Sequence, residues 1–187
     1  MALRLNGSTS GYVELNAPAV AGSTSLNVPF GVIQAVQAVK SDTFSTGTSG
    51  SNTFVDITGL SLSITPKFSS SKILLMATVH GSGSGYSQLC SLRFVRGSTA
   101  IGLGDSRSGF FQATQGYIRA SSDNNSCWNT HIQYLDSPAT TSATTYKIQG
   151  QVEPSGGFRI NRSAADGSNN TFGAMGISTL TALEIAA

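Results

Sequence analysis

The chain has 187 residues, enough for one ordinary domain with a short extension. Only 11% of its residues are charged, against about 25% in average soluble domains. The formal net charge is +2, and the basic residues are scattered without a run, which argues against a nucleic-acid-binding protein. Because surfaces that contact other proteins are depleted in charge, this composition fits an assembly protein as well as a low-charge globular domain.

The first 33 residues differ from the rest of the chain. The sequence Gly-Ser-Thr-Ser stands at residues 7–10 and again at residues 22–25. Each copy precedes a short extended stretch, at residues 12–15 and 26–28. Two short strands cannot bury a core of their own. We therefore expect residues 1–33 to form a docking arm that lies on the main domain or on a neighbouring subunit, and residues 34–187 to form that domain.

Residues 34–187 predict strands, because glycine, serine and threonine interrupt every window long enough for a helix. Between residues 144 and 153, apolar Tyr146, Ile148 and Val152 alternate with polar residues, which indicates a strand with one buried face. Further strands are predicted at residues 60–64, 72–79, 86–95, 128–135 and 177–185, with 34–40 as a connector or first strand. Glycine- and serine-rich segments separate them at residues 81–85, 104–109, 121–125 and 164–168. This spacing predicts an all-β fold, an antiparallel β-sandwich of jelly-roll type with an extended N-terminal arm.

Two of these strands are apolar on both faces. One spans residues 73–77 and the other lies near the C-terminus. Such a strand is either covered on both sides by its own domain or faces another subunit. On the second interpretation, the candidate residues of an oligomer interface are Ile73, Leu74, Met76, Leu180 and Leu183.

Motifs for catalysis or metal binding do not emerge from the sequence. His80 and His131 are isolated and favour surface or edge positions, and no Cys-x-x-Cys, His-x-His or phosphate-loop spacing occurs. The Gly-Ser-Gly-Ser-Gly run at residues 81–85 favours a flexible hairpin loop over a nucleophile elbow. Loop aspartates such as Asp105, Asp123 and Asp166 can bind calcium but more often make turns. The sequence therefore predicts a protein that is not an enzyme, with no catalytic residues, no metal site and no cofactor.

The two cysteines, Cys90 and Cys127, permit one disulfide. Because Cys90 alternates in phase with buried positions and Cys127 is out of phase with its neighbours, two free thiols packed as small hydrophobes are favoured over a bridge. The longest strongly apolar run, residues 73–77, is far shorter than a membrane span, and the N-terminus has no apolar signal-peptide core. We expect no membrane insertion and no conventional secretion.

Three aromatic residues lie in a stretch rich in glycine and glutamine: Phe110, Phe111 and Tyr117. In exposed loops, such side chains can stack on sugar rings or anchor a partner protein. The alternative is that they fill the core of the sandwich. On the first interpretation they are candidate binding residues.

Several segments of the chain resemble segments of tail-fibre-like and other virion structural proteins of tailed bacteriophages, particularly marine cyanophages. The similar segments are residues 15–23, 54–74, 94–102 and 134–141, the second of which reads FVDITGLSLSITPKFSSSKIL. The resemblance implies a trimeric, β-rich module, often with a jelly-roll-like end, and no catalytic residues. The chain departs from full tail fibres in its size, because it has no repetitive shaft.

These observations predict a non-enzymatic virion structural protein, a homotrimeric surface appendage of tail-fibre type. Its predicted partners are other copies of itself, other virion proteins through residues 1–33, and a glycan or protein of the host surface, but no nucleic acid. It is expected to assemble in the host cytoplasm, to reside in the virion and to be released by lysis. One alternative is a capsid (head) decoration or knob-like protein, and a second is a virion-associated glycan hydrolase.

Overall fold

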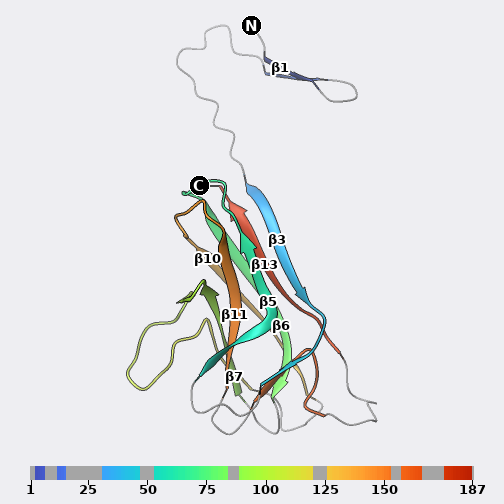
Figure 1. Ribbon diagram of the computed structural model, residues 1–187, viewed down its shortest axis with the longest axis vertical. Coiled ribbons are helices and arrows are strands. Elements are labelled where there is room, and N and C mark those ends of the chain that lie inside the picture. Colours follow the sequence, from blue (N-terminus) through green and yellow to red (C-terminus); the bar gives the residue numbers. More distant parts are fainter. Residues whose placement is uncertain are drawn as a thin grey trace.

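The computed structural model describes residues 3–6, 12–15, 31–46, 53–83, 89–119, 126–152, 157–165 and 175–186 (Figure 1). Within these ranges all regular structure is β-strand, which confirms the predicted all-β class. The strands are β1 (Leu3–Asn6), β2 (Tyr12–Leu15), β3 (Val32–Lys40), β4 (Phe44–Ser45), β5 (Phe54–Ile64), β6 (Lys72–Gly83), β7 (Leu89–Arg96), β8 (Thr99–Ile101), β9 (Gln115–Arg119), β10 (Trp128–Asp136), β11 (Thr144–Val152), β12 (Phe158–Ile160) and β13 (Ser178–Ile185).

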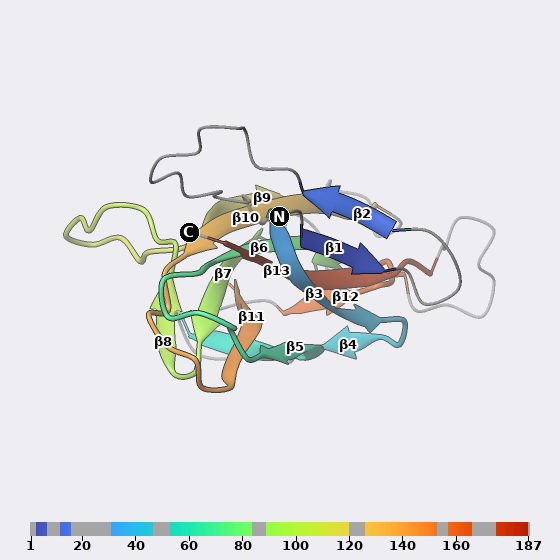
Figure 2. The same cartoon turned by 90° about the horizontal axis from the view of Figure 1, so that it is seen from above.

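Two large antiparallel sheets pack face to face (Figures 1 and 2). The first has the order β3-β13-β6-β10, with β12 pairing the far end of β6 on the side of β13 and β4 pairing β12. The second has the order β5-β11-β7, with β8 and β9 both on the free edge of β7. Every pairing between these strands is antiparallel.

The strand order is that of a jelly roll. Taken in chain order, the eight main strands are β3, β5, β6, β7, β9, β10, β11 and β13. They pair from the outside inwards: β3 with β13, β5 with β11, β6 with β10 and β7 with β9. This nested pairing is one long antiparallel hairpin rolled into two sheets, the arrangement expected of a jelly roll. The predicted fold class is therefore confirmed.

The core lies between the sheets and is built from alternate residues of each strand, because successive side chains of a strand point to opposite faces. On β6 the inward residues Ile73 and Leu75 are fully buried, and on β13 so is Leu180. On the opposite sheet, Tyr146 and Phe94 fill the same space. Ile73 and Leu180 were candidates for an oligomer interface. That prediction is wrong, because both side chains are fully buried in the core of a single chain.

Within the glycine-rich segment at residues 81–85, where the sequence predicts a flexible loop, residues 81–83 belong to strand β6, and residues 84–85 lie outside the described residues. Strand β6 continues to Gly83, since Gly81 is paired with Trp128 of β10 on one edge and with Ile160 of β12 on the other. A Cβ atom at Gly81 would stand 2.6 Å from the carbonyl oxygen of Arg159 and 2.7 Å from the Trp128 ring. Glycine is therefore required here by close packing, and Trp128 is a core residue that is 7% exposed.

A buried ionic cluster ties the two sheets together. Asp136, at the end of β10, accepts a 2.6 Å hydrogen bond from the hydroxyl of Tyr146 on β11. A guanidinium nitrogen of Arg96 on β7 donates to both carboxylate oxygens of Asp136 at 2.9 Å. Burial of Tyr146 and its hydrogen bond to Asp136 raise the pKa of the phenol. Asp136 and Tyr146 are nearly removed from water, whereas the side chain of Arg96 is 32% exposed, so the buried carboxylate depends on its two partners.

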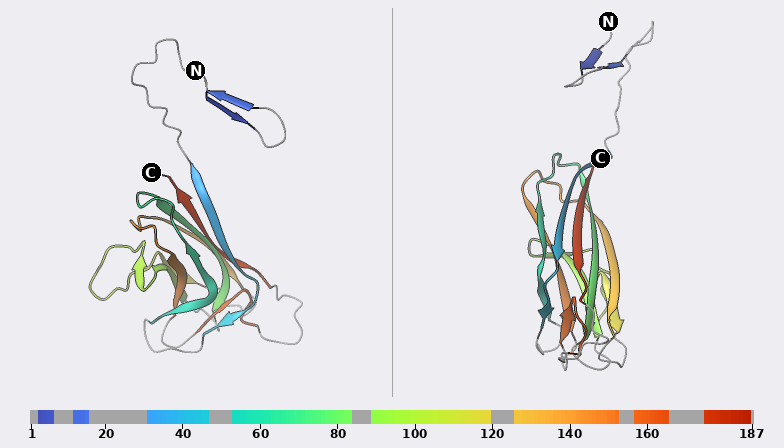
Figure 3. Two further views of the ribbon diagram at one scale, coloured as in Figure 1. Left: turned by 45° about the horizontal axis from the view of Figure 1, so that its top comes forward. Right: turned by 90° about the vertical axis from the view of Figure 1, so that its right-hand side faces the viewer.

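Strands β1 and β2 form a separate two-stranded sheet. Among the described strands each pairs only with the other, in the register Leu3↔Leu15, Arg4↔Glu14, Leu5↔Val13 and Asn6↔Tyr12. In Figure 3 this hairpin stands apart from the two large sheets. The expected extended stretch at residues 12–15 is confirmed as β2, whereas the stretch expected at residues 26–28 lies outside the described residues. Strand β3 begins at Val32, close to the expected start of the domain at residue 34, and the docking role of residues 1–33 stays a prediction.

Candidate functional site

The outer face of the β3-β13-β6-β10 sheet is a broad surface without acidic residues. We define this outer face by the described residues of these strands that alternate with the core positions. They are Ala35, Gln37, Val39, Lys72, Leu74, Met76, Thr78, His80, Asn129, His131, Gln133, Leu135, Thr179, Thr181, Leu183 and Ile185. Among them only Lys72 carries a full charge, and its ammonium group is bound to the hydroxyl of Ser137 at 2.7 Å. The face is therefore nearly neutral.

Apolar side chains are exposed on and beside the outer face. Val39 of the edge strand β3 is 55% exposed, and Leu135 of the other edge strand, β10, is 52% exposed. Ile177, just before β13, is 58% exposed. Single exposed hydrophobic residues are common on protein surfaces, but three on or beside one neutral sheet face make that face a candidate contact surface.

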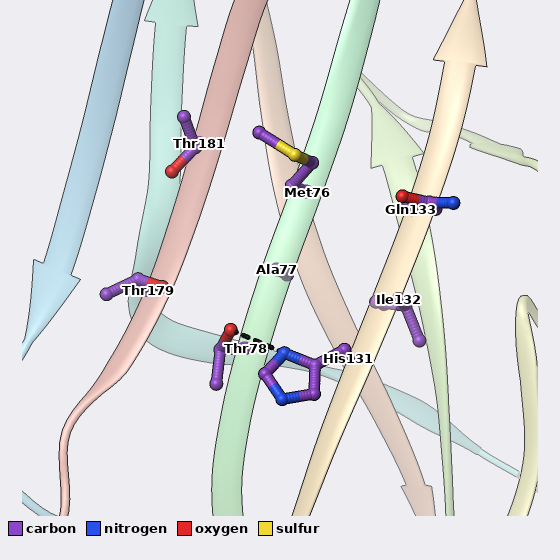
Figure 4. A pocket seen from close by; sticks show the side chains of 8 residues that line it. All are labelled: Met76, Ala77, Thr78, His131, Ile132, Gln133, Thr179 and Thr181. Atoms are coloured by element: carbon purple, nitrogen blue, oxygen red, sulfur yellow. Dashed lines mark hydrogen bonds between the residues drawn. The ribbon is translucent and has the colours of Figure 1, made fainter.

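A hollow of about 520 Å³ occupies the middle of the outer face (Figure 4). It is lined by residues of three neighbouring strands: Met76, Ala77, Thr78, His131, Ile132, Gln133, Thr179 and Thr181. The hydroxyl oxygen of Thr78 and Nδ1 of His131 lie 2.9 Å apart in a cross-strand hydrogen bond. Hydroxyl, amide and imidazole groups around a thioether can hold a partner by hydrogen bonds and apolar contact. This hollow has no signal in the sequence, because its residues are brought together by strand pairing.

The remaining predicted interface residues lie on the outer face. Leu74 and Met76 on β6 and Leu183 on β13 are partly buried and alternate with core residues. In the register of the sheet, Leu74 stands between Leu183 and Leu135. The structure thus separates the five predicted residues into two inside the core and three on a single surface.

A second candidate site is a pocket of about 440 Å³ within residues 104–116. Phe110 is 67% exposed at this pocket, and the guanidinium carbon of Arg107 lies 5.0 Å from the centre of its ring. The amide group of Gln112 donates a 2.6 Å hydrogen bond to the carbonyl of Gly104, which closes the loop on itself. The predicted loop at residues 104–109 is confirmed, and Phe110 stands in it as an exposed aromatic residue.

The other two predicted aromatic residues lie differently. Phe111 is partly buried and packs edge-on against Phe54, with ring centres 5.8 Å apart. Tyr117 belongs to strand β9 rather than to a loop, because β9 pairs the free edge of β7. Its side chain lies outside the described part of the structure. Of the three, Phe110 therefore fits the predicted role as an exposed loop aromatic.

A polar network runs from this pocket across the outer face of the second sheet. The guanidinium group of Arg93 stacks 3.9 Å from the centre of the Phe54 ring and donates to Gln149 at 2.8 Å. Gln149 and Lys147 each donate to Asp56 at 2.7 Å. Burial opposes ionisation of Asp56, but these hydrogen bonds outweigh it and lower the pKa of the carboxyl group. The network holds Phe54 in place beneath Phe111.

The two histidines have different environments. His131 is exposed on the edge strand β10, as its sequence context predicts. His80 lies within β6 rather than at its end, and its ring packs against Gly176. Burial lowers the pKa of His80, because it disfavours the charged imidazolium.

Both cysteines are free thiols, as favoured by the sequence. Cys90 is buried, and burial raises its pKa to about 12, so the expectation of a thiol packed as a hydrophobe is confirmed for this residue. Cys127 is exposed, and the same expectation is wrong for it. Among the described residues there is no group of three potential metal ligands and no helix that could cross a membrane. Asp123 and Asp166, two of the loop aspartates considered for calcium, lie outside those residues.

No protein-family model matches the chain, and no curated protein matches it. Solved structures of infectious bursal disease virus are similar to it. The Gx strain structure matches with a TM-score of 0.44 and 14% identity over 95% of this chain and 43% of that chain. The structure of the VP2 subviral particle matches with a TM-score of 0.40 and 14% identity, over 97% of this chain and 45% of that chain. The chain spans less than half the length of these proteins. At such TM-scores, the jelly-roll assignment rests on the strand order alone.

Proposed function

We propose that this protein is a non-enzymatic structural component of a bacteriophage particle, a homotrimeric surface appendage of tail-fibre type. The observation that carries the proposal is the outer face, a neutral sheet surface with exposed Val39 and Leu135. The resemblance of residues 54–74 and 94–102 to tailed-phage virion proteins supports the same assignment. Its place is the virion, after assembly in the host cytoplasm and release by lysis.

The size of the outer face suits an assembly surface. Four strands about 4.8 Å apart, running side by side over about seven residues at about 3.4 Å per residue, cover about 450 Å² in projection. A standard protein–protein interface buries about 800 Å² on each partner. The outer face therefore supplies more than half of such an interface before any loop or arm contributes.

The buried carboxylates of the described residues serve the fold, which supports a structural role. Asp136 is saturated by Arg96 and Tyr146. Glu184 accepts hydrogen bonds from the amide of Gln34 at 2.5 Å and from the backbone nitrogen of Lys67 at 2.6 Å. Groups held in this way position strands, and they are poor candidates for proton transfer.

The pocket beside Phe110 is the proposed point of contact with the host surface. Phe110 combines 67% exposure with a neighbouring guanidinium group, and the carboxylate of Asp105 lies at the same pocket. An exposed ring and a few fixed polar groups are the usual means of holding a sugar ring or an anchoring side chain.

Self-association can be tested by measuring the molar mass of the full chain with size-exclusion chromatography and light scattering. We expect three times the 19.3 kDa of one chain. Leu135→Asp should return the mass to one chain, because it places a charge in a surface whose burial contributes about 1.5–3 kcal/mol for each leucine. The matched control is Phe68→Asp, since Phe68 is 54% exposed but lies in the turn after β5. A monomeric unmodified chain would contradict the proposal.

The place in the particle can be tested by electron microscopy of intact phage with gold-labelled antibody against residues 41–187. We expect label on the tail. Label over the head would replace the appendage by a capsid decoration protein, and particles without any label would contradict a virion role.

A further inference from the structure

The first large sheet ends in two long strands whose outer edges are unpaired. Strand β3 forms one edge and β10 the other, and among the described residues no strand pairs with the outer side of either. Strand β10 pairs β6 without interruption over its nine residues, and β3 pairs β13 without interruption from Gln34 to Lys40. Each edge therefore offers a regular row of backbone groups to water or to a further strand.

The edges of the second large sheet are protected. Its edge strand β5 is interrupted where the register with β11 shifts between Lys147 and Gln149, and Gly59 within the interruption has φ of 90°. The opposite edge, on β7, is covered by the short strands β8 and β9. Bulges and short covering strands are devices by which proteins prevent edge-to-edge association. The same chain thus blocks the edges of one sheet and leaves those of the other open.

Charged side chains and prolines, the other common protections, are also missing from the open edges. The aspartate, glutamate, lysine and arginine residues of β3 and β10 are Lys40 and Asp136 alone, and each stands at the end of its strand. The side chain of Lys40 is 1% exposed and that of Asp136 is 6% exposed, and both are held in ion pairs within the chain. Neither strand contains proline. The open edges therefore carry no feature that would keep another strand away.

The hydrogen bonds of His80 show which backbone groups point to the open edges. Its backbone nitrogen donates to the hydroxyl of Ser178, and its carbonyl oxygen accepts from the backbone nitrogen of Asn161, so both groups point away from β10. Backbone groups alternate in direction along an antiparallel strand, and this alternation can be followed through the register of the sheet. It directs the backbone groups of the odd-numbered residues to the open edges, namely Ala35, Gln37 and Val39 on β3, and Asn129, His131, Gln133 and Leu135 on β10.

The two open edges match each other. Each neighbouring pair among the four strands is antiparallel, so the edge strands β3 and β10 run in opposite directions (Figure 4). Copies related by rotation about an axis along the strands can therefore bring β10 of one copy and β3 of the next together in antiparallel orientation. At both edges the residues with free backbone groups belong to the outer face. Pairing them joins outer face to outer face and forms about six hydrogen bonds, two for each free residue of β3.

We propose that strand β10 of one copy pairs with strand β3 of the next, so that the first sheet continues from copy to copy. Three copies joined in this way close into a ring in which every β3 and every β10 is paired on both sides. Tyr134, which is 37% exposed on the core side of β10, and Val36, which is partly buried on the core side of β3, lie at this junction and become more deeply buried. The inference rests on the self-association proposed above and names the contact that produces it.

Proline at the open edges tests this pairing. Gln133→Pro removes a backbone N–H that has no partner within one copy, and Gln37→Pro does the same on β3. Each proline variant should reduce the measured mass from three chains to one. The matched controls Gln133→Ala and Gln37→Ala remove the same side chains but keep the N–H groups, and both should remain trimeric. The far-ultraviolet circular dichroism of all four variants should match that of the unmodified chain, because edge strands accept proline.

Three outcomes of this experiment would overturn the inference. The first is a trimer that survives both prolines. The second is dissociation of the alanine variants, which would place the contact in side chains of the outer face. The third is dissociation by Gln133→Pro but not by Gln37→Pro, which would mean that β10 pairs with β10 of another copy.

Hydrogen exchange of the unmodified chain gives a second test that needs no substitution. Within one copy the amides of Gln37 and Gln133 face water, whereas those of Ala38 and Ile132 are bonded to β13 and β6. In the trimer we expect all four amides to exchange slowly, because the edge amides are then paired as well. Fast exchange at Gln37 and Gln133 in the trimer would show that the edges remain unpaired and would overturn the inference.

The two proposals can fail separately. If both proline variants remain trimeric while Leu135→Asp dissociates, copies associate through the outer face without pairing of edges, and only the inference fails. If the unmodified chain is monomeric at every concentration, the proposed self-association itself fails.

Discussion

Replacing Asn161 should test how the ends of three strands are held together. Asn161 is fully buried and has φ of 64°, a left-handed conformation. Its side-chain nitrogen donates to the backbone carbonyls of Lys40 at 2.8 Å and Asp42 at 2.9 Å, and its side-chain oxygen accepts from the hydroxyl of Ser178 at 2.7 Å. Its backbone nitrogen donates to the carbonyl of His80 at 2.8 Å. One residue thus joins the end of β3, the middle of β6 and the start of β13.

The cost of Asn161→Ala follows from these contacts. Three lost side-chain hydrogen bonds contribute about 0.5–1.5 kcal/mol each, and a left-handed alanine adds about 1–2 kcal/mol. We expect the free energy of unfolding to fall by about 3–5 kcal/mol. Asn161→Gly loses the same hydrogen bonds without the backbone strain. Its free energy of unfolding should therefore be about 1 kcal/mol higher than that of Asn161→Ala.

Equilibrium unfolding in urea, with fluorescence of Trp128 as the probe, measures both variants of Asn161 under identical conditions. The difference in free energy of unfolding between the alanine and glycine variants is the sharper result, because errors of extrapolation to zero urea cancel between the two. A loss below about 1 kcal/mol for Asn161→Ala would refute the hydrogen-bond reasoning. A glycine variant less stable than the alanine variant would refute the assignment of strain to the left-handed backbone.

Two further predictions concern acid stability and host contact. Because the pKa of His80 is lowered from its ordinary value of 6.5, the unfolded chain takes up a proton first, and stability should begin to fall as the pH drops below about 6.5. Burial opposes ionisation of Glu184, but hydrogen bonds from Gln34, Ser71 and nearby backbone amides outweigh it and lower its pKa from 4.5, so a second loss should follow below about pH 4.5. The midpoint of urea unfolding, measured from pH 7.5 to 3.5, checks both losses of stability. The variant His80→Gln should abolish only the loss below pH 6.5. A midpoint of the unmodified chain that stays constant down to pH 5 would contradict the role of His80. Phe110→Ala should lower phage adsorption to host cells several-fold while particle yield and morphology stay unchanged, with Phe68→Ala as an exposed control; equal adsorption by both variants would contradict the contact.

The sequence by itself determined the class of fold and most of the strands. Alternation between apolar and polar residues has the period of a strand, so β10, β11 and the second half of β5, residues 60–64, could be placed from the printed residues alone. The same alternation indicated two sheets with a shared core, and the glycine- and serine-rich intervals indicated antiparallel connections. These features depend on near neighbours in the chain, and pattern analysis therefore reached them.

Strand pairing decided what local patterns could not. Strand β6 is apolar on both faces, so the sequence could not say that Ile73 points into the core while Leu74 and Met76 point out. Gly81 suggested a loop, and only its close approach to Trp128 and to the backbone of Arg159 explains why the strand continues through it.

The outer face is the clearest case of a feature that the tertiary structure alone creates. Its hollow joins Thr78, His131 and Thr181, which are more than 45 residues apart in the chain and become neighbours because β13, β6 and β10 pair side by side. Each of these residues lies in an unremarkable polar position of its own strand. A surface made by lateral pairing of distant strands has no local signature, because the contacts that define it lie across the strands rather than along the chain.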